Sequence, residues 1–281
     1  MGEERKAAAA GRFYAGNETS LRNQIEECFK SRHGPGSIPQ VSDGPRKILG
    51  LISPHAGYPY SGPIAAHGFF NLAKDGIRER IVILGPNHSG LGRDVAIDNS
   101  NLWRTPLGTV KIDKDFAREL AERSDVVEFD SNAHHSEHSL EVQLPFLQYL
   151  FDGEFKIVPI CIGRQTMDVS RELGESLGEM ADENTLVIAS SDFTHYEPID
   201  SAKAKDKKAI ERIEKMDWKG FLNLVSKENL SICGYSPIAV LMKAVEKMNG
   251  EKTKLFKYAT SGDTAGSPGQ VVGYCSLGFL K

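Results

Sequence analysis

The stretch ILGLISPHAGYPYSG, residues 48–62, joins a short apolar run to an abrupt break and a histidine. Residues 48–52 have the apolar character of a buried strand. Ser53-Pro54 ends that strand and delivers His55 into a glycine turn. The stretch therefore predicts a strand that presents one histidine just beyond its carboxyl end.

A second stretch repeats this design. Residues 81–84, IVIL, form another short β-branched run, which breaks at Gly85-Pro86 and presents His88 before a glycine-rich loop. In parallel sheets, ligands bind beyond the carboxyl ends of the strands. We therefore expect His55 and His88 to lie on one edge of one sheet, joined by a β-α-β unit with a right-handed crossover.

Composition excludes several classes of protein. The chain has 281 residues, a net charge of −4 and 26% charged residues, and no apolar run approaches the roughly 20 residues of a membrane span. Its basic residues are mixed with acidic ones, which argues against a nucleic-acid-binding surface. Residues 1–16 lack the apolar segment of a secretory signal, so we expect a cytoplasmic protein whose four cysteines are thiols.

Strand-like and helical patterns alternate along the chain. This alternation predicts an α/β fold with a single domain over residues 1–281, built on a central mixed, mostly parallel sheet with helices on both faces. The main expected strands are 48–52, 81–84, 155–162, 185–191, 255–259 and 271–280, the last two as edge strands. The expected helices are 21–29, 61–74, 113–123, one from Ser139 onward, 169–180, 202–216, 218–226 and 237–248.

The expected strand 185–191 also ends in polar residues, because Ser-Ser-Asp-Phe-Thr-His follows its apolar part. Asp192 and His195 in this loop suit an acid/base pair, with Asp192 orienting the His195 ring. A general base must keep one ring nitrogen free, so we expect His195 not to be a metal ligand. The alternative is that His195 only caps the strand end.

Residues 133–148, AHHSEHSLEVQLPFLQ, concentrate histidines. His134 and His138 are four residues apart and would share one face of a helix. We expect both to support a site rather than to bind metal, and Glu141 to orient His138 by a hydrogen bond. The alternative is an ordinary helix start, with Ser139 as its cap.

The motifs PHAGYPYSG, GPNH, EHSLEVQLPF, SSDFTHY and ICGYSPI, preceded by Gly11-Arg12-Phe13-Tyr14, resemble the Memo family in the same order over nearly the whole chain. The form of the histidine-rich segment resembles the bacterial and archaeal branch, of the AmmeMemoRadiSam system protein B type. This resemblance implies an AMMECR-type protein and a radical-SAM protein as partners.

The Memo fold is similar to that of the class III extradiol dioxygenases, which hold non-heme iron. The resemblance implies that His55 and His88 are metal ligands, that Cys233 is the third, and that His195 is the acid/base histidine with Asp192 beside it. It implies Fe(II) as the metal. Because a thiolate is softer than a carboxylate, Cu(I) and Zn(II) are alternatives.

Two main functional hypotheses follow. The first is a redox metalloenzyme that resembles the dioxygenases and acts on an unknown small molecule. The second is a catalytically silent binding module that recognises a partner protein or sequesters a metal, because fold alone does not determine function. A zinc hydrolase is a third hypothesis, and it predicts hydrolysis that does not depend on oxygen.

Overall fold

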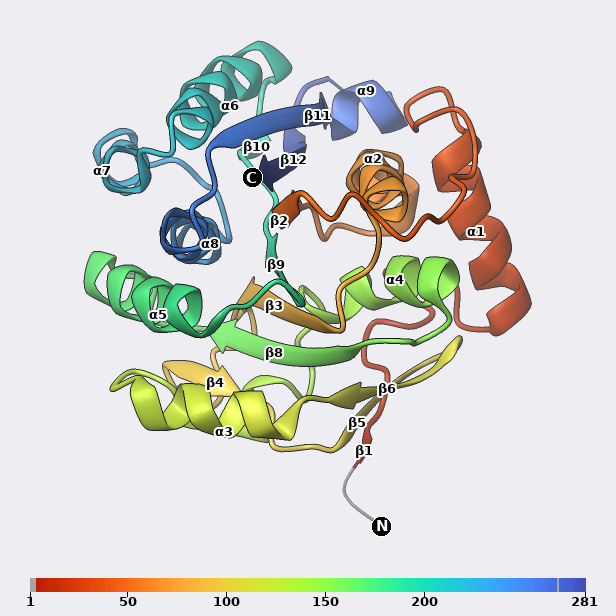
Figure 1. The fold of residues 1–281 in the computed structure, drawn as a ribbon. Coiled ribbons are helices and arrows are strands. Elements are labelled where there is room, and N and C mark those ends of the chain that lie inside the picture. The colour runs from red at the N-terminus through yellow and green to blue at the C-terminus, as the bar shows by residue number, and fades with distance from the viewer. Residues whose placement is uncertain (1–3, 267) are drawn as a thin grey trace.

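Figure 1 shows one mixed sheet running through the molecule, with helices packed on both faces. The computed structural model describes residues 4–266 and 268–281. Twelve strands form the sheet. They are β1 (Glu4–Arg5), β2 (Ile48–Ser53), β3 (Arg80–Pro86), β4 (Val95–Ile97), β5 (Leu102–Thr105), β6 (Gly108–Ile112), β7 (Glu128–Phe129), β8 (Lys156–Ile162), β9 (Thr185–Ser190), β10 (His195–Glu197), β11 (Lys252–Thr260) and β12 (Val271–Leu280).

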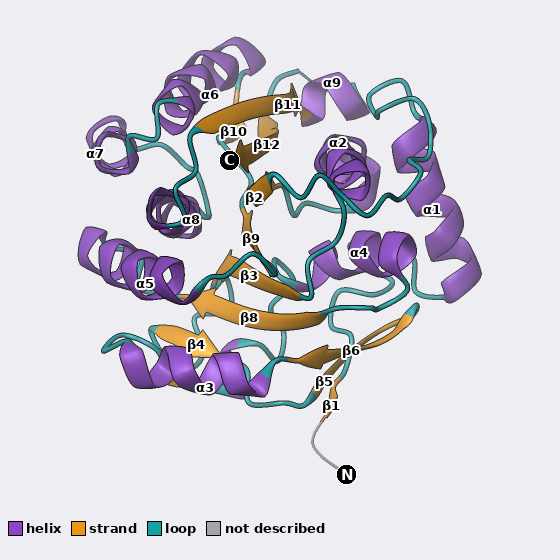
Figure 2. Ribbon diagram, in the orientation of Figure 1, coloured by secondary structure: helices purple, strands orange, loops and turns teal. Residues whose placement is uncertain are grey.

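The helices form two layers around this sheet (Figure 2). The α-helices of the described residues are α1 (Glu18–Lys30), α2 (Tyr58–Asp75), α3 (Lys114–Arg123), α4 (Leu144–Phe151), α5 (Met167–Met180), α6 (Ile199–Glu214), α7 (Trp218–Glu228), α8 (Tyr235–Lys247) and α9 (Ser261–Ala265). Two short 3₁₀ turns, η1 (Ser131–Ala133) and η2 (Glu141–Gln143), precede α4.

The centre of the sheet is parallel. Its strands lie in the order β6-β8-β3-β9-β2, and every neighbouring pair among them is parallel. Antiparallel strands extend it on both sides, with β5 next to β6 and β12 next to β2. The expected α/β fold with a mixed, mostly parallel sheet is therefore confirmed, while the boundaries 1–281 remain a prediction.

Side chains of the central strands alternate between two cores. In β3, Val82 and Leu84 belong to the core beneath α3, α5, α6, α7 and α8, whereas Ile81 and Ile83 belong to the core beneath α1, α2 and α4. Successive side chains of a strand point to opposite faces, and both faces here are covered by helices. This double burial explains why the strands read as continuous apolar runs in the sequence.

The expectation that residues 271–280 form an edge strand is wrong. Strand β12 lies inside the sheet, between β2 and β11, and its first residues also pair with β10. Its residues carry no charge and are mostly buried, which suits an interior position. The edge belongs to β11, whose lysines at positions 252, 254 and 257 are of the kind that protect edge strands from pairing with other chains.

The expected start of the helix at Ser139 is also wrong. The chain forms the 3₁₀ turn η2 at residues 141–143, and α4 begins only at Leu144. Pro145 has no N–H and is tolerated in a first helical turn but not inside a helix, so the helix starts beside it. His134 and His138 therefore do not share a helical face.

The two histidine-bearing strands are not neighbours in the sheet. Strand β9 lies between β2 and β3 and pairs in parallel with both, with Ser190 opposite Ser53 and Ala189 opposite Leu84. The three strands therefore end together at one edge, which brings the segments after Ser53, Pro86 and Ser190 close to one another.

The carboxylate of Glu141 ties the N-terminal segment to the segment before α4. Glu141 is fully buried and accepts hydrogen bonds from Arg5 Nη1 (2.6 Å), Ala8 N (2.8 Å), Ala9 N (2.8 Å) and the Tyr14 hydroxyl (2.5 Å). Four donors satisfy both oxygens, so the buried charge is compensated.

None of the helices that the structure describes combines the length and apolar character that a membrane crossing requires.

We expect Glu141→Gln to lower the free energy of unfolding by about 3–5 kcal/mol, because it leaves the buried Arg5 charge without its partner. Urea unfolding followed by circular dichroism measures this change. The control is Glu119→Gln, which breaks the exposed pair with Arg123 and should change stability by less than about 1 kcal/mol. Equal stabilities of the two variants would contradict the importance of the Glu141 contacts.

Candidate metal centre

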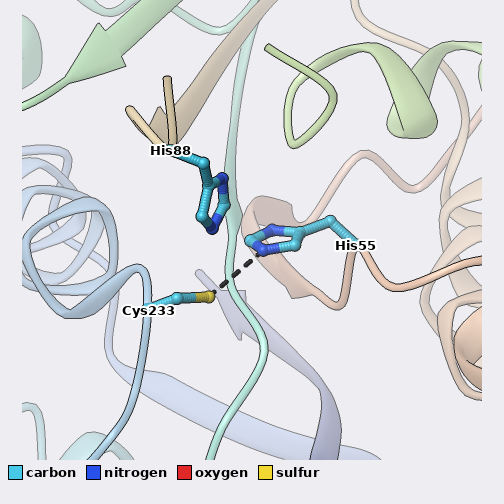
Figure 3. A group of neighbouring side chains, drawn as sticks. All are labelled: His55, His88 and Cys233. Atoms are coloured by element: carbon cyan, nitrogen blue, oxygen red, sulfur yellow. Dashed lines mark hydrogen bonds between the residues drawn. The ribbon is translucent and has the colours of Figure 1, made fainter. Parts of the chain in front are cut away.

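Three side chains converge beyond the carboxyl ends of β2, β9 and β3. Figure 3 shows His55, His88 and Cys233 turned toward a common point. One donor atom from each residue lies within 4.8 Å of the other two, and the His55 Nε2 to Cys233 Sγ distance is 3.1 Å. The structure thus brings together the three residues expected as ligands, although they are up to 178 positions apart in the sequence.

Hydrogen bonding fixes which nitrogen of His55 carries the proton. The Ser190 hydroxyl donates its only hydrogen to the Ser139 carbonyl (2.6 Å) and accepts from the Gln143 amide (2.8 Å). The Gln143 amide also donates to the Pro54 carbonyl, which identifies it as the NH₂ group. His55 Nδ1, 2.9 Å from the same hydroxyl, must therefore be a donor. The unprotonated Nε2 faces Cys233.

His88 is held in the same way by a carboxylate. Glu137 is buried and accepts from the His88 ring at Nδ1 (2.9 Å) and from its backbone N–H (2.6 Å). Burial by itself raises the pKa of Glu137, but the hydrogen bond and charge of His88 and the Ser139 N–H hold that pKa well below its usual range. Glu137 is therefore an acceptor for Nδ1–H, and Nε2 of His88 is free for a metal.

Cys233 lies in the loop before α8, and its position is fixed by its backbone. The Gln165 side chain donates to the Cys233 carbonyl (2.7 Å), and the Asp192 N–H donates to Sγ (3.2 Å). Burial, followed by the nearby charge of Asp192, raises the pKa of the Cys233 thiol. A bound cation would favour the thiolate, because metal ions displace the proton of a coordinating thiol.

His138 lies against the cluster rather than behind it. Its ring stacks on that of His88 at 4.7 Å between centroids and meets His55 edge-on at 5.5 Å, while Phe13 stacks on it at 4.0 Å. Its Nδ1 is 3.4 Å from Glu137. Burial, offset only in part by the charge of Glu137, lowers the pKa of His138 to about 4. This ring is therefore neutral near pH 7.

The role expected for Glu141 is wrong. Both of its oxygens are occupied by the N-terminal segment, and the carboxylate that contacts His138 is Glu137. Glu137 was missed because its type and position in EHSLE gave no reason to prefer it. Its contacts with His88 and His138 are visible only in the three-dimensional structure.

His134 does not support the cluster directly. Its Nε2 donates to the Ala96 carbonyl (2.9 Å), and its ring meets Trp103 edge-on. Its Nδ1 is buried without a hydrogen-bond partner among the described residues. The contact of this residue with the site is through its backbone, because its carbonyl accepts from Arg5 (2.7 Å), which also donates to the Glu137 carbonyl (2.7 Å).

Asp192 and His195 lie near the cluster but are not paired with each other. Asp192 accepts from the backbone N–H groups of His55 (2.8 Å) and Ala56 (3.3 Å), and burial raises its pKa to about 6. His195 Nδ1 instead contacts the Ser231 carbonyl (2.7 Å). Ser231 rather than Asp192 therefore orients the His195 ring, which corrects the expected pairing.

His195 keeps one ring nitrogen available. A carbonyl can only accept, so Nδ1 carries a proton, and Nε2 is the nitrogen without a proton in the neutral ring. Burial is the main cause of the raised pKa of Asp192 and of the lowered pKa of His55, and the ring of His195 is close enough that a charge on it would act on both groups. The remaining cysteines, at positions 28, 161 and 275, are buried free thiols within helix α1 and strands β8 and β12.

Comparison with known proteins places these motifs in a wider group. A family model described as Memo-like protein matches residues 5–278. MEMO1 family proteins of Methanopyrus kandleri and Sulfurisphaera tokodaii are 48% and 46% identical to this chain, covering 99% and 98% of it and 99% of each relative. An uncharacterised Escherichia coli K12 protein of known structure has a similar fold, with a TM-score of 0.57 and 14% identity over 82% of this chain and 99% of its own.

Because the His134 ring is buried, it should make the stability of the folded protein depend on pH. Burial lowers its pKa from 6.5 to about 4, so below pH 6.5 the unfolded chain takes up a proton that the folded protein does not. This contribution to stability is complete above pH 6.5 and is lost as the pH falls toward 4. From pH 7 to pH 5 the loss is about 2 kcal/mol.

We expect His134→Gln to remove about 2 kcal/mol of the stability lost between pH 7 and pH 5. Urea unfolding of metal-free protein at both pH values measures this slope. His33→Gln, a change in a surface loop, is the control and should retain the wild-type slope. An unchanged slope in His134→Gln would mean that this ring is protonated in the folded protein.

Proposed function

We propose that this chain, which belongs to the Memo family, is a metal-dependent oxidoreductase that acts on a small molecule. The observation that carries the proposal is the convergence of His55, His88 and Cys233, with one donor atom of each within 4.8 Å of the others. A two-histidine, one-thiolate set leaves coordination positions open for a substrate.

The histidine donors fit a metal ion in protonation state, and the pair formed by His55 and Cys233 fits one in spacing. Both histidines are held with Nδ1 protonated and Nε2 free, by Ser190 and Glu137 respectively. The contact of 3.1 Å between His55 Nε2 and Cys233 Sγ is close to the separation of about 3.5 Å expected for nitrogen and sulfur ligands of a tetrahedral ion.

Fe(II) is the metal that we propose, by likeness to the class III extradiol dioxygenases, with Cu(I) and Zn(II) as competitors. Imidazole suits all three ions, whereas a thiolate favours the softer ones. A redox-active ion in this position supplies electron transfer and activates a bound substrate as a Lewis acid.

The protein groups around the donors have separate tasks in this proposal. His195, with its free Nε2, accepts or donates a proton at the substrate. Asp192 holds the turn that carries His55, through two backbone N–H groups. His138 and Phe13 form an aromatic wall against His88 that restricts water.

The competing hypotheses predict different experiments. Anaerobically purified protein is loaded with Fe(II) and mixed with catechols, phenols and thiols while oxygen is recorded. Oxygen consumption that requires both metal and substrate supports the oxidoreductase. A silent panel together with a co-purifying partner supports the binding module, and hydrolysis without oxygen supports the zinc hydrolase.

The proposal also includes a cytoplasmic location and two partner proteins. The free state of all four cysteines supports a reducing, cytoplasmic location. Membership of the Memo family supports an AMMECR-type protein and a radical-SAM protein as the partners to test first. Co-purification of tagged protein from its own host is the corresponding experiment.

We expect His55→Ala and His88→Ala each to lower bound metal by about tenfold or more while the fold is retained. Metal content is measured after anaerobic loading and desalting. The matched control is His67→Ala, which removes a histidine of α2 whose ring contacts the His33 carbonyl instead. Metal content equal to wild type in either site variant would contradict its assignment as a ligand.

We expect His195→Ala to retain its metal and to lose about two to four orders of magnitude of oxygen-dependent turnover, the usual share of general acid/base catalysis. The assay uses Fe(II)-loaded protein with whichever substrate the panel identifies, and His67→Ala again serves as control. If His195→Ala instead lost its metal, His195 would be a ligand and Cys233 would be the assignment to withdraw.

A further inference from the structure

A cavity of about 680 Å³ lies between the N-terminal segment and the loop that follows β7. One wall is the N-terminal segment at residues 4–8 and Arg12, and the other is the loop at residues 131–136 with Asp98 and Ser100. Its volume is in the range of small-molecule sites. None of the proposed metal ligands lines it, so it is a separate space in the fold.

The cations of this cavity differ in whether they are paired. Arg5 is buried and bound to Glu141 at 2.6 Å. Lys6 and Arg12 are exposed, and neither forms an ion pair with any carboxylate in residues 4–266 or 268–281. Two exposed positive charges therefore line the cavity without a carboxylate partner among the described residues.

The carboxylates of the cavity are, by contrast, fully engaged. Glu4 is held by both nitrogens of Arg104, at 2.6 and 2.7 Å. Asp98 is completely buried and accepts from the Ser100 hydroxyl (2.8 Å), the Trp103 ring N–H (2.5 Å) and the Ser131 hydroxyl (2.6 Å). These acids cannot turn toward Lys6 or Arg12 without breaking their own hydrogen bonds. The cavity is consequently cationic in a chain whose net charge is −4.

Uncharged donors complete the lining. The side chains of Asn132, His135 and Ser136 are exposed on the opposite wall, and the described part of the chain provides none of them with a hydrogen-bond partner. An amide, an imidazole and a hydroxyl that face an ammonium and a guanidinium are the groups that bind oxyanions. A cationic ligand would meet the charges of Lys6 and Arg12.

Each wall of the cavity includes a residue that is adjacent in sequence to a residue at the candidate metal centre. Arg12 precedes Phe13, which stacks on His138, and Ser136 precedes Glu137, which holds His88. Burial is the main cause of the low pKa of His138, and the charge of Arg12 lowers it further. An anion in the cavity would therefore lie within electrostatic reach of the centre.

We propose that this cavity is an oxyanion-binding site, in which Lys6 and Arg12 bind a phosphate or carboxylate group between the N-terminal segment and the 131–136 loop. Asn132, His135 and Ser136 donate the uncharged hydrogen bonds. The site needs no metal ion, so it does not rest on the proposed redox function.

The test uses the full chain, stripped of metal with EDTA and dialysed, at low ionic strength. Inorganic pyrophosphate and tricarballylate are titrated separately by isothermal calorimetry, as the phosphate and carboxylate probes. The variant Lys6→Gln/Arg12→Gln removes both charges from exposed positions, and thermal unfolding verifies that it is folded. The matched control is Lys207→Gln/Arg118→Gln, which removes the same charges from the exposed faces of α6 and α3.

We expect saturable binding of at least one probe, weakened about tenfold or more in the double variant and unchanged within about twofold in the control, because two charge-assisted hydrogen bonds are lost. The better probe identifies the preferred anion. Equal affinity in the double variant and wild type, an equal loss in the control, or no saturable binding of either probe up to about 10 mM overturns the proposal. Because the protein is metal-free, failure of the metal proposal would leave this result unaffected.

Discussion

The parallel pairing of β3, β9 and β2 is the constraint on which the rest of the structure depends. Parallel strands in register end at the same edge, and here Ser190 lies opposite Ser53 and Ala189 opposite Leu84. The segments that follow Ser53, Pro86 and Ser190 therefore lie close together at this edge. Cys233 joins them from the loop before α8, whose helix packs on the same strands.

Two buried carboxylates organise this edge in different ways. Glu137 accepts the ring proton and the backbone N–H of His88, which fixes the orientation and tautomer of that ring. Glu141 binds Arg5 and the N-terminal segment, and Arg5 in turn holds the carbonyls of His134 and Glu137. The first residues of the chain thus support a loop more than 120 positions away, which explains why a short N-terminal segment is so fully hydrogen-bonded.

Burial keeps three groups of this edge, His55, His138 and the Cys233 thiol, uncharged near pH 7. It lowers the pKa of the His55 and His138 rings and raises that of the Cys233 thiol, which disfavours the charged form of each. Glu137 and Asp192 are the nearby carboxylates; Glu137 accepts hydrogen bonds from His88 and Ser139, and Asp192 accepts from the backbone N–H groups of His55 and Ala56. A cation would be favoured here because it would interact with neutral nitrogen lone pairs and would convert the thiol to a thiolate.

The sequence by itself determined the α/β class, most strands and helices, and the two histidines beyond strand ends, because continuous apolar runs, helical patterns of period 3.6 and Pro-Gly breaks are local signals. It also provided the family, through five ordered motifs. Only the tertiary structure decided that β12 is an interior strand, that β9 separates the two histidine strands and that Ser231 orients His195. It also decided that Glu137 has the contact with His138 that was expected of Glu141, while Glu141 binds the N-terminal segment. Strand order and hydrogen-bond partners depend on residues tens to more than a hundred positions apart, and no local pattern specifies which donor a buried acceptor will meet.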